Sequence, residues 1–423
     1  MKLSHINYLH ALFLSGFAYL LFSAGEANGM VTDPLPKDFR ISVHNPLDRE
    51  RSDVLIHVNE SDLKSKYPDF NPKGFKVFNG ENEIPSQYND LGTAKGIVFV
   101  LPELAANEMQ TLSIAYDPTK DLNPAYPKRT QAEISHKVGG HFENRKYIGG
   151  SFQNVNELHV PEEHTDHSWY IRYEGPGWES DKVGYRFYLD WRNGVDVFGK
   201  TTPEPILQLV GQDGFDSYHE MQVWGMDVLK VGKSLGVGSI ATFTNGQARR
   251  VDETDSLYAG ITNNGPVYSS VLTKYYGWNL EDNKTTITSN ISIHGGTRMS
   301  KQELNSSSPI DNFATGLIKD NKGKLIQGGD SSDYGYLATY GPQSLNNDNL
   351  GIAVLFRNDQ KREITSDQHS HVVVLNPVNN NLTYYFLAAW EMEEEGIKDE
   401  ASFKTYLEQQ VEELSNPVEI TLL

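Results

Sequence analysis

The amino-acid sequence predicts an all-β protein, a large antiparallel β-sandwich with a short C-terminal helix. Two observations lead to this fold class. Apolar and polar residues alternate through most of the 423-residue chain, as in half-buried strands, and Asn, Gly, Pro and Asp residues separate the alternating runs. Only Glu400–Leu414 carries apolar residues at helical spacing, and no repeat of about 20–50 residues indicates a propeller or a solenoid.

The first alternating runs are short and are joined by polar turns, so we expect them to form strands. They are Arg40–Pro46, Asp53–Val58, Phe75–Phe78, Gly96–Leu101 and Gln110–Tyr116. The polar, proline-containing segment Pro118–Lys128 follows them and is typical of a crossover between two parts of a fold.

A second and longer series of strands begins at Lys146. The clearest is Val183–Arg192, whose apolar face consists of Val183, Tyr185, Phe187, Leu189 and Trp191. The others are Glu220–Lys230, Ser234–Thr244, Tyr268–Tyr276, Thr285–His294, Gly335–Ala338, Gly351–Arg357, His369–Leu375 and Leu382–Trp390. So many antiparallel strands with one late helix favour two large packed sheets.

The N-terminus has the pattern of a secretory signal. Lys2 precedes the apolar run Ala11–Ala24, and Gly25 and Ala27 suit the −3 and −1 positions of a cleavage site. We therefore expect a signal peptide at 1–28 and one large domain at 29–423. Within that domain we expect N-terminal strands at 29–117, a crossover at 118–145, and the main sheets and helix at 146–423.

This run predicts a periplasmic or secreted protein without stable membrane insertion; the alternative is an uncleaved anchor. The chain contains no cysteine, which excludes a lipoprotein anchor, disulfides, a thiol nucleophile and Cys-ligated metal centres. A net charge of −19 without any basic run argues against nucleic-acid binding. The GxSxG, Walker, GxGxxG and HExxH motifs are absent from the sequence.

The polar face of Val183–Arg192 is the first candidate site. Arg186, Tyr188 and Arg192 recur at alternate positions there, together with Asp190. Guanidinium groups bind carboxylates or sulfates in a bidentate way, and a tyrosine donates a proton or stacks on a sugar. The alternative is a solvated outer face on which Asp190 pairs with an arginine.

Histidines supply candidate general bases in two further segments. His164 lies in HVPEEHTDHSWY among acidic residues and other histidines, and His219 follows a tyrosine in the segment that contains Trp224 and Lys233. Each histidine has a structural alternative, a surface loop for His164 and a buried, hydrogen-bonded ring for His219. The acidic surroundings of His164 leave a divalent metal open, although the spacing matches no zinc signature.

His294 and Arg298 form a weaker candidate at the end of strand Thr285–His294. Small hydroxyl and amide residues share a face with His294, and Arg298 follows the Gly295-Gly296 turn. Such a face suits either solvent or sugar hydroxyls.

Three segments resemble a bacterial family of exported proteins long catalogued as a domain of unknown function. They are Glu174–Lys200 (EGPGWESDKVGYRFYLDWRNGVDVFGK), Tyr218–Ser239 and Tyr384–Glu391. The family is similar to galactose-mutarotase-like super-sandwiches and includes an ulvan oligosaccharide dehydratase. The resemblance therefore implies a super-sandwich that acts on uronate-containing, sulfated or unsulfated oligosaccharides.

The implied reaction removes water across C4–C5 of a non-reducing terminal uronic acid. It requires neutralisation of the substrate carboxylate, a base for the C5 proton and an acid for the 4-hydroxyl. We assign Arg186 and Arg192 to neutralisation, His164 or His219 to the base, and Tyr188 or a histidine to the acid. Trp224, Lys233, His294 and Arg298 are candidate substrate-binding residues, and we expect a local basic cleft on this acidic protein.

Three other functions remain open at this stage. An endo-acting polysaccharide lyase needs the same base and the same neutralisation, but its leaving group is a sugar. A non-catalytic carbohydrate-binding protein needs only aromatic-rich strands, and an epimerase or mutarotase exchanges a proton without loss of water. No cofactor is indicated, and the sequence does not determine the oligomeric state.

Overall fold

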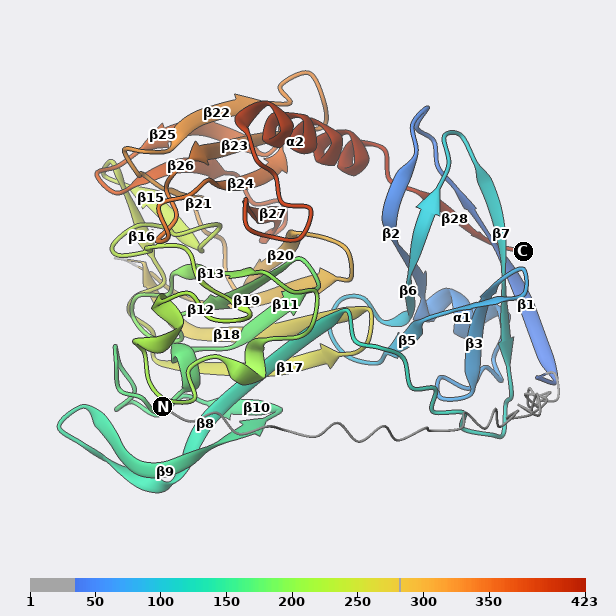
Figure 1. Ribbon diagram of the computed structural model, residues 1–423, viewed down its shortest axis with the longest axis horizontal. Coiled ribbons are helices and arrows are strands. Elements are labelled where there is room, and N and C mark those ends of the chain that lie inside the picture. The colour runs from blue at the N-terminus through green and yellow to red at the C-terminus, as the bar shows by residue number, and fades with distance from the viewer. Residues whose placement is uncertain (1–34, 281–282) are drawn as a thin grey trace, which may run out of the picture. The chain divides into compact units, whose positions relative to one another are not determined.

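The computed structural model describes residues 35–280 and 283–423 (Figure 1). The expected signal peptide at 1–28 lies outside the described residues. Strands dominate the described chain, and all strand pairings within its five sheets are antiparallel. None of the helices found there combines the length and the apolar character needed to cross a membrane.

Two sheets of the N-terminal region enclose one apolar core, which includes Ile41, Val43, Ile56 and Phe99. The first sheet runs β28 (Glu419–Leu422), β1 (Lys37–His44), β7 (Met109–Tyr116), β3 (Phe75–Asn79) and β4 (Asn82–Ile84). The second runs β2 (Arg51–Asn59), β6 (Gly96–Leu104) and β5 (Ser86–Asn89). All five strands that the sequence predicts in this region are confirmed within a few residues.

Helix α1 (Glu60–Lys66) is an element that the sequence pattern did not predict. Its N-cap Asn59 accepts a hydrogen bond from the Ser61 backbone, and acidic residues occupy its first turn, as favoured at a helix N-terminus. Only Leu63 is buried in its seven residues. A single apolar residue makes no stripe, which is why helical spacing could not reveal this helix.

The largest sheet has nine strands. In spatial order they are β10 (Glu157–His159), β17 (Ser256–Asn264), β18 (Tyr268–Leu280), β19 (Asn283–His294), β20 (Met299–Ser306), β27 (Asn381–Trp390), β24 (Leu350–Arg357), β23 (Tyr334–Gly341) and β22 (Lys324–Gly328). Helix α2 (Glu400–Ser415) packs against β23 and β24 through Phe403, Leu407 and Val411, which confirms the predicted C-terminal helix.

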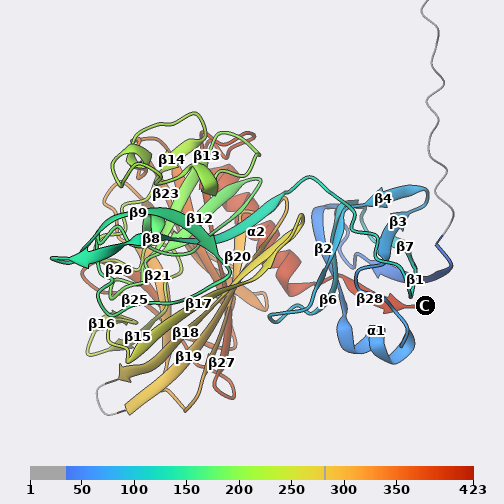
Figure 2. The same cartoon turned by 90° about the horizontal axis from the view of Figure 1, so that it is seen from below.

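Two further sheets complete the sandwich. One runs β14 (Gly225–Asp227), β13 (Val195–Lys200), β12 (Val183–Phe187), β11 (Gly177–Ser180), β8 (Thr130–Glu143) and β9 (Lys146–Val155). The other runs β16 (Gln247–Arg250), β15 (Ala241–Thr244), β21 (Phe313–Ile318), β26 (Ser370–Leu375) and β25 (Lys361–Ser366). Figure 2 shows β17, β18 and β19 side by side, with β8 crossing near them.

A common apolar core joins the facing sheets. The Trp178 ring of β11 stacks on Tyr185 of β12 at 5.7 Å and meets the edge of Phe386 from β27 at 6.4 Å. The buried Tyr185 hydroxyl accepts a hydrogen bond from the Ala388 backbone, so the layers are also linked by polar contacts. The predicted β-sandwich is confirmed.

Four predicted elements differ in the structure. The expected strand Ser234–Thr244 forms a strand only at β15 (Ala241–Thr244). The strand expected to reach Arg192 stops at Phe187, and the next residues form a turn that exposes Trp191. The expected strand Glu220–Lys230 contains only the short β14, preceded by a 3₁₀ turn at Ser217–His219. The segment expected as a crossover at 118–145 contains β8, because its residues from Thr130 onward find pairing partners in β11 and β9.

Candidate functional site

Neighbouring strands place a cluster of polar side chains on the face of β12 and β13 opposite the sandwich core. Arg186 lies between the core residues Tyr185 and Phe187, so strand alternation directs it to the other face. Its register partner on β13 is Asp196, and β14 adds Asp227. The antiparallel register therefore brings one guanidinium and two carboxyl groups together.

Arg186 is fully enclosed by protein acceptors, with 1% of its surface exposed. Its Nη2 donates to Asp196 at 2.8 Å and to Asp227 at 2.6 Å, and its Nε donates to Asp196 at 3.2 Å. Its Nη1 donates to the Tyr218 hydroxyl at 3.0 Å and to the Tyr173 carbonyl at 3.1 Å. All five N–H groups are thus engaged, which leaves no donor for a substrate carboxylate and gives Arg186 a positioning role.

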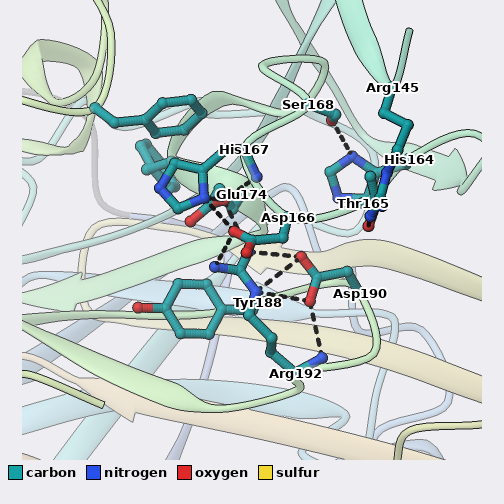
Figure 3. A network of polar contacts seen from close by, with 12 residues as sticks. Arg145, His164, Thr165, Asp166, His167, Ser168, Glu174, Tyr188, Asp190 and Arg192 are labelled. Atoms are coloured by element: carbon teal, nitrogen blue, oxygen red, sulfur yellow. Dashed lines mark hydrogen bonds and ion pairs between the residues drawn. The ribbon is translucent and has the colours of Figure 1, made fainter. Parts of the chain in front are cut away.

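Arg192 is held in the same way at the edge of this cluster. Its guanidinium donates to Asp190 at 2.6 Å and Glu174 at 2.7 Å, and its Nη1 lies 2.7 Å from Asp166 (Figure 3). Burial alone would raise the pKa of Glu174, but Arg192 and Arg186 lower it. Glu174 therefore stays ionised and fixes Arg192.

The expected basic cleft is not found at Arg186 and Arg192, because carboxyl groups surround both arginines. Five carboxyl groups surround the two guanidinium groups: Asp166, Glu174, Asp190, Asp196 and Asp227. Burial, and then the charge of Asp196, raises the pKa of Asp227 well above its usual value, and the charge of Arg186 opposes this rise. The arginines are neutralised within the protein.

Tyr188 lies between the two guanidinium groups. The centre of its ring lies 5.0 Å from the guanidinium carbon of Arg186 and 4.2 Å from that of Arg192. Its hydroxyl donates a hydrogen bond to Asp196 at 2.7 Å. Burial, and then the Asp196 carboxylate, raises its pKa well above the usual value. Tyr188 thus keeps its proton and directs it into the cluster.

Two histidines form the exposed edge of the cluster. The His219 side chain is 42% exposed, its Nδ1 contacts the Phe215 carbonyl, and its Nε2 lies 3.6 Å from Asp227 Oδ2. The His167 side chain is 61% exposed, its Nδ1 contacts Asp166, and its ring lies 5.0 Å from the Phe215 ring. The two imidazoles therefore flank Phe215.

His219 is suited to accept a proton. Burial, and then the Arg186 charge, lowers its pKa from 6.5, so the ring is neutral near pH 7. A hydrogen bond from Nδ1 to the Phe215 carbonyl leaves the lone pair on Nε2. Tyr218 and His219 do not point to opposite faces as an extended backbone would require, since the 3₁₀ turn brings their rings to 4.6 Å.

His164 lies inside the site rather than on its surface. Its Nδ1 contacts the Ser168 hydroxyl at 2.8 Å, and its buried Nε2 has no hydrogen-bond partner among the described residues (Figure 3). Burial lowers its pKa to about 4. His164 is therefore a neutral ring that positions the loop, and it is less accessible as a base than His219.

The backbone around the cluster is strained. Five non-glycine residues there adopt left-handed backbone conformations: His167 (φ 55°), Trp169 (φ 55°), Tyr173 (φ 40°), Glu174 (φ 71°) and Asn193 (φ 36°). Each costs about 1–3 kcal/mol, and such strain concentrates at functional sites. Together with the shifted pKa values, this concentration marks the cluster as the candidate active site.

In the part of the chain that the structure describes, one group of potential metal ligands lies close together, and a metal is disfavoured there. Ligand atoms of Asp166, His167 and Glu174 lie within 4.8 Å of one another. Arg192 donates to or pairs with both carboxylates, so a guanidinium already supplies the positive charge that they balance.

The other predicted binding residues lie outside the cluster. Trp224 is buried against Phe198, and Lys233 lies exposed on a loop. His294 and Arg298 line a different cleft of 660 Å³, and Arg298 donates to Glu393 at 2.7 Å. None of the residues that line that cleft belongs to the Arg186 cluster.

Sequence reasoning missed three members of the site, which are Glu174, Asp196 and Asp227, whereas it had singled out Tyr218 beside His219 and His167 in the segment of His164. One signal was available, because Asp196 interrupts the apolar run Val195–Phe198 and a charged residue there requires a buried partner. The partner itself depends on strand register and could not be identified from the sequence.

Comparisons with known proteins place the whole chain in context. A sequence family described as "Domain of unknown function (DUF4861)" matches residues 43–420. Uncharacterized protein P7 of Formosa agariphila is 24% identical over 414 residues, covering 90% of this chain and 93% of the relative.

Two solved structures are similar in fold to this chain. They are a protein in the glycosyl hydrolase family 38 from Enterococcus faecalis (TM-score 0.45, 8% identity) and an α-mannosidase from E. faecalis V583 (TM-score 0.47, 9% identity). Each match covers 91% of this chain but only 47% and 46% of the respective solved chains. The present chain thus spans about half their length.

Proposed function

The chain belongs to the family catalogued as domain of unknown function DUF4861, and we propose that it is a carbohydrate-active lyase. The specific reaction is removal of water across C4–C5 of a non-reducing terminal uronic acid of ulvan-type oligosaccharides. The sequence resemblance supports the substrate class. The observation that supports the reaction type is the position of His219, whose Nε2 lies 3.6 Å from the buried Asp227 that Arg186 holds.

The first step is proton abstraction. The C5–H bond breaks, its proton moves to His219 Nε2, and the electron pair passes toward the uronate carboxyl group as an enediolate. His219 is neutral and therefore ready to accept this proton. The imidazolium that forms lies 3.6 Å from Asp227, whose pair with Asp196 carries compensating negative charge.

The second step is departure of the 4-hydroxyl. The C4–O bond breaks as the C4=C5 double bond forms, and a proton joins the leaving oxygen to give water. We assign this proton to His167, whose Nδ1 is held by Asp166 and whose exposed ring lies 5.0 Å from the Phe215 ring. Tyr188, the alternative acid, is buried and directs its hydroxyl to Asp196.

Incubation with saturated, uronate-ended oligosaccharides tests the proposal. The product should show the ultraviolet band of a conjugated uronate and a mass lower by one water. Long polymer should keep its viscosity, whereas an endo-acting lyase would reduce it. Proton exchange at C5 without water loss would instead identify an epimerase, and no change with any uronate-ended substrate would refute catalysis.

We also propose that this activity is exported to the periplasm or the medium, on the basis of the apolar run Ala11–Ala24 after Lys2. Expression of the full-length gene in a Gram-negative host, followed by cell fractionation and N-terminal sequencing, would test this. Recovery of uncleaved protein from the cytoplasm would count against export.

A further inference from the structure

Arg250 differs from the other two arginines near the cluster, because among the described residues it forms no ion pair, and the carboxylates that influence it, Asp190 and Asp252, are more distant. It is the last residue of β16 and is partly buried. Its Nη1 donates to the Ser234 carbonyl at 2.9 Å and approaches the Gly232 carbonyl at 3.4 Å. Within residues 35–280 and 283–423, no carboxylate lies within ion-pair distance of Arg250, and its Nε and Nη2 form no hydrogen bond.

The Arg250 side chain reaches the candidate active site beside Gly194. A Cβ added to Gly194 would lie 3.2 Å from Arg250 Nη1 and 3.4 Å from a ring carbon of Tyr188. Arg192 lies over the same tyrosine ring at 4.2 Å. The absence of a side chain at Gly194 therefore lets Arg250 approach Tyr188.

Such a position is unfavourable for a guanidinium without an anion. Burial, and then the like charge of Arg192, lowers the pKa of Arg250. Partly desolvated charges are normally paired, and an unpaired one is stabilised when a ligand supplies the missing charge. Arg186 and Arg192 cannot bind an anionic ligand in this way, since their carboxylate partners already neutralise them.

We propose that Arg250, beside Gly194 and the Gly232–Ser234 loop, is the subsite that binds the carboxylate of the sugar substrate. The free Nε and Nη2 of Arg250 present two donors to a planar carboxylate, and the exposed Lys233 adds positive charge at the rim. This inference rests on the proposed function for the identity of the sugar. It replaces Arg186 and Arg192 with Arg250 as the group that neutralises the substrate.

Binding measurements on a matched pair of variants test this subsite. Arg249 precedes Arg250 on the same strand but pairs with Asp252, so Arg249→Gln is the control for Arg250→Gln. The ligands are a glucuronate-ended oligosaccharide and its carboxyl-reduced, glucose-ended analogue. Affinities are measured by calorimetry in the His219→Asn background, which prevents turnover, and kcat and KM in the otherwise unaltered enzyme.

Arg250→Gln should weaken binding of the glucuronate-ended ligand by about 10- to 100-fold and leave the reduced analogue unaffected. Arg249→Gln should change the affinity for neither ligand. Arg250→Lys keeps the positive charge but lacks the two parallel N–H donors of a guanidinium, so it should give an intermediate loss of affinity. Equal weakening of both ligands, or no effect of Arg250→Gln, would overturn the subsite. Failure of all variants and of the unaltered chain to bind the glucuronate-ended ligand would overturn it too.

The two proposals fail in different ways. If Arg250 discriminates between the charged and reduced ligands but no unsaturated product forms, the carboxylate subsite stands and the dehydratase proposal fails. If product forms at an unchanged KM and kcat in Arg250→Gln, the dehydratase stands and the subsite fails.

Discussion

His219 places its Nε2 3.6 Å from Oδ2 of Asp227, so a half-exposed imidazole lies directly over a fully buried carboxyl group. The 3₁₀ turn at Ser217–His219 and the strand β14 produce this relationship from residues eight positions apart. The carboxyl group is in turn held by Arg186. The proposed base is thus a half-exposed imidazole beside a buried carboxyl group whose pKa is raised.

Replacement of His219 should abolish turnover without unfolding the protein. His219→Asn retains a donor for the Phe215 carbonyl but removes the proton acceptor, so kcat should fall by about 10²- to 10⁴-fold. Product absorbance reports the rate and circular dichroism the fold. His159→Gln alters an exposed histidine at the end of β10 and serves as the control. A His219→Asn enzyme with normal kcat would exclude His219 as the base.

The pH dependence of kcat/KM should report the protonation of His219. His219 must be neutral to accept the C5 proton, and burial lowers its pKa from 6.5, so the acid limb should have its midpoint below pH 6.5. An acid limb above pH 6.5 in the unaltered enzyme would contradict this assignment.

Removal of the Arg186 charge should destabilise the fold strongly. Arg186→Met leaves two carboxyl groups buried without their guanidinium, which costs about 3–5 kcal/mol in the free energy of unfolding. Arg357→Met breaks an exposed pair with Asp359 and should cost less than about 1 kcal/mol. Urea unfolding at pH 7.5 measures the free energy of unfolding of both variants. If the two variants lost equal stability, burial of the Arg186 ion pairs would not determine their contribution.

Stability should decrease in acid because of His164. Its pKa is about 4 in the folded chain and 6.5 in the unfolded chain, so its stabilising effect is complete above pH 6.5 and is lost as pH falls through 4. The difference corresponds to about 3 kcal/mol. His164→Asn retains a contact for Ser168 but cannot titrate.

Unfolding free energies at pH 7.5 and pH 4.5 provide the measurement for His164. The unaltered protein should lose about 2–3 kcal/mol more than His164→Asn between these values. The same pH dependence in both proteins would show that His164 is not buried as a neutral ring.

The local pattern of the chain determined the fold class and most of its elements. Alternation predicted β19, β24 and β27 within a few residues, because a strand with one buried face needs only period-2 spacing. The stripe of Phe403, Leu407 and Val411 similarly predicted α2. Alternation also failed at Tyr188–Arg192, where a turn replaces the strand so that Asp190 and Arg192 can pair.

The sequence by itself determined that Arg186 lies opposite the sandwich core, since strand alternation is a local property. It also excluded a thiolate base or nucleophile, because the chain has no cysteine. Only the tertiary structure decided which charges meet: strand register placed Asp196 and Asp227 against Arg186 and left Arg250 without an ion-pair partner among the described residues. Charge pairing depends on contacts between segments distant in sequence, which no local pattern encodes.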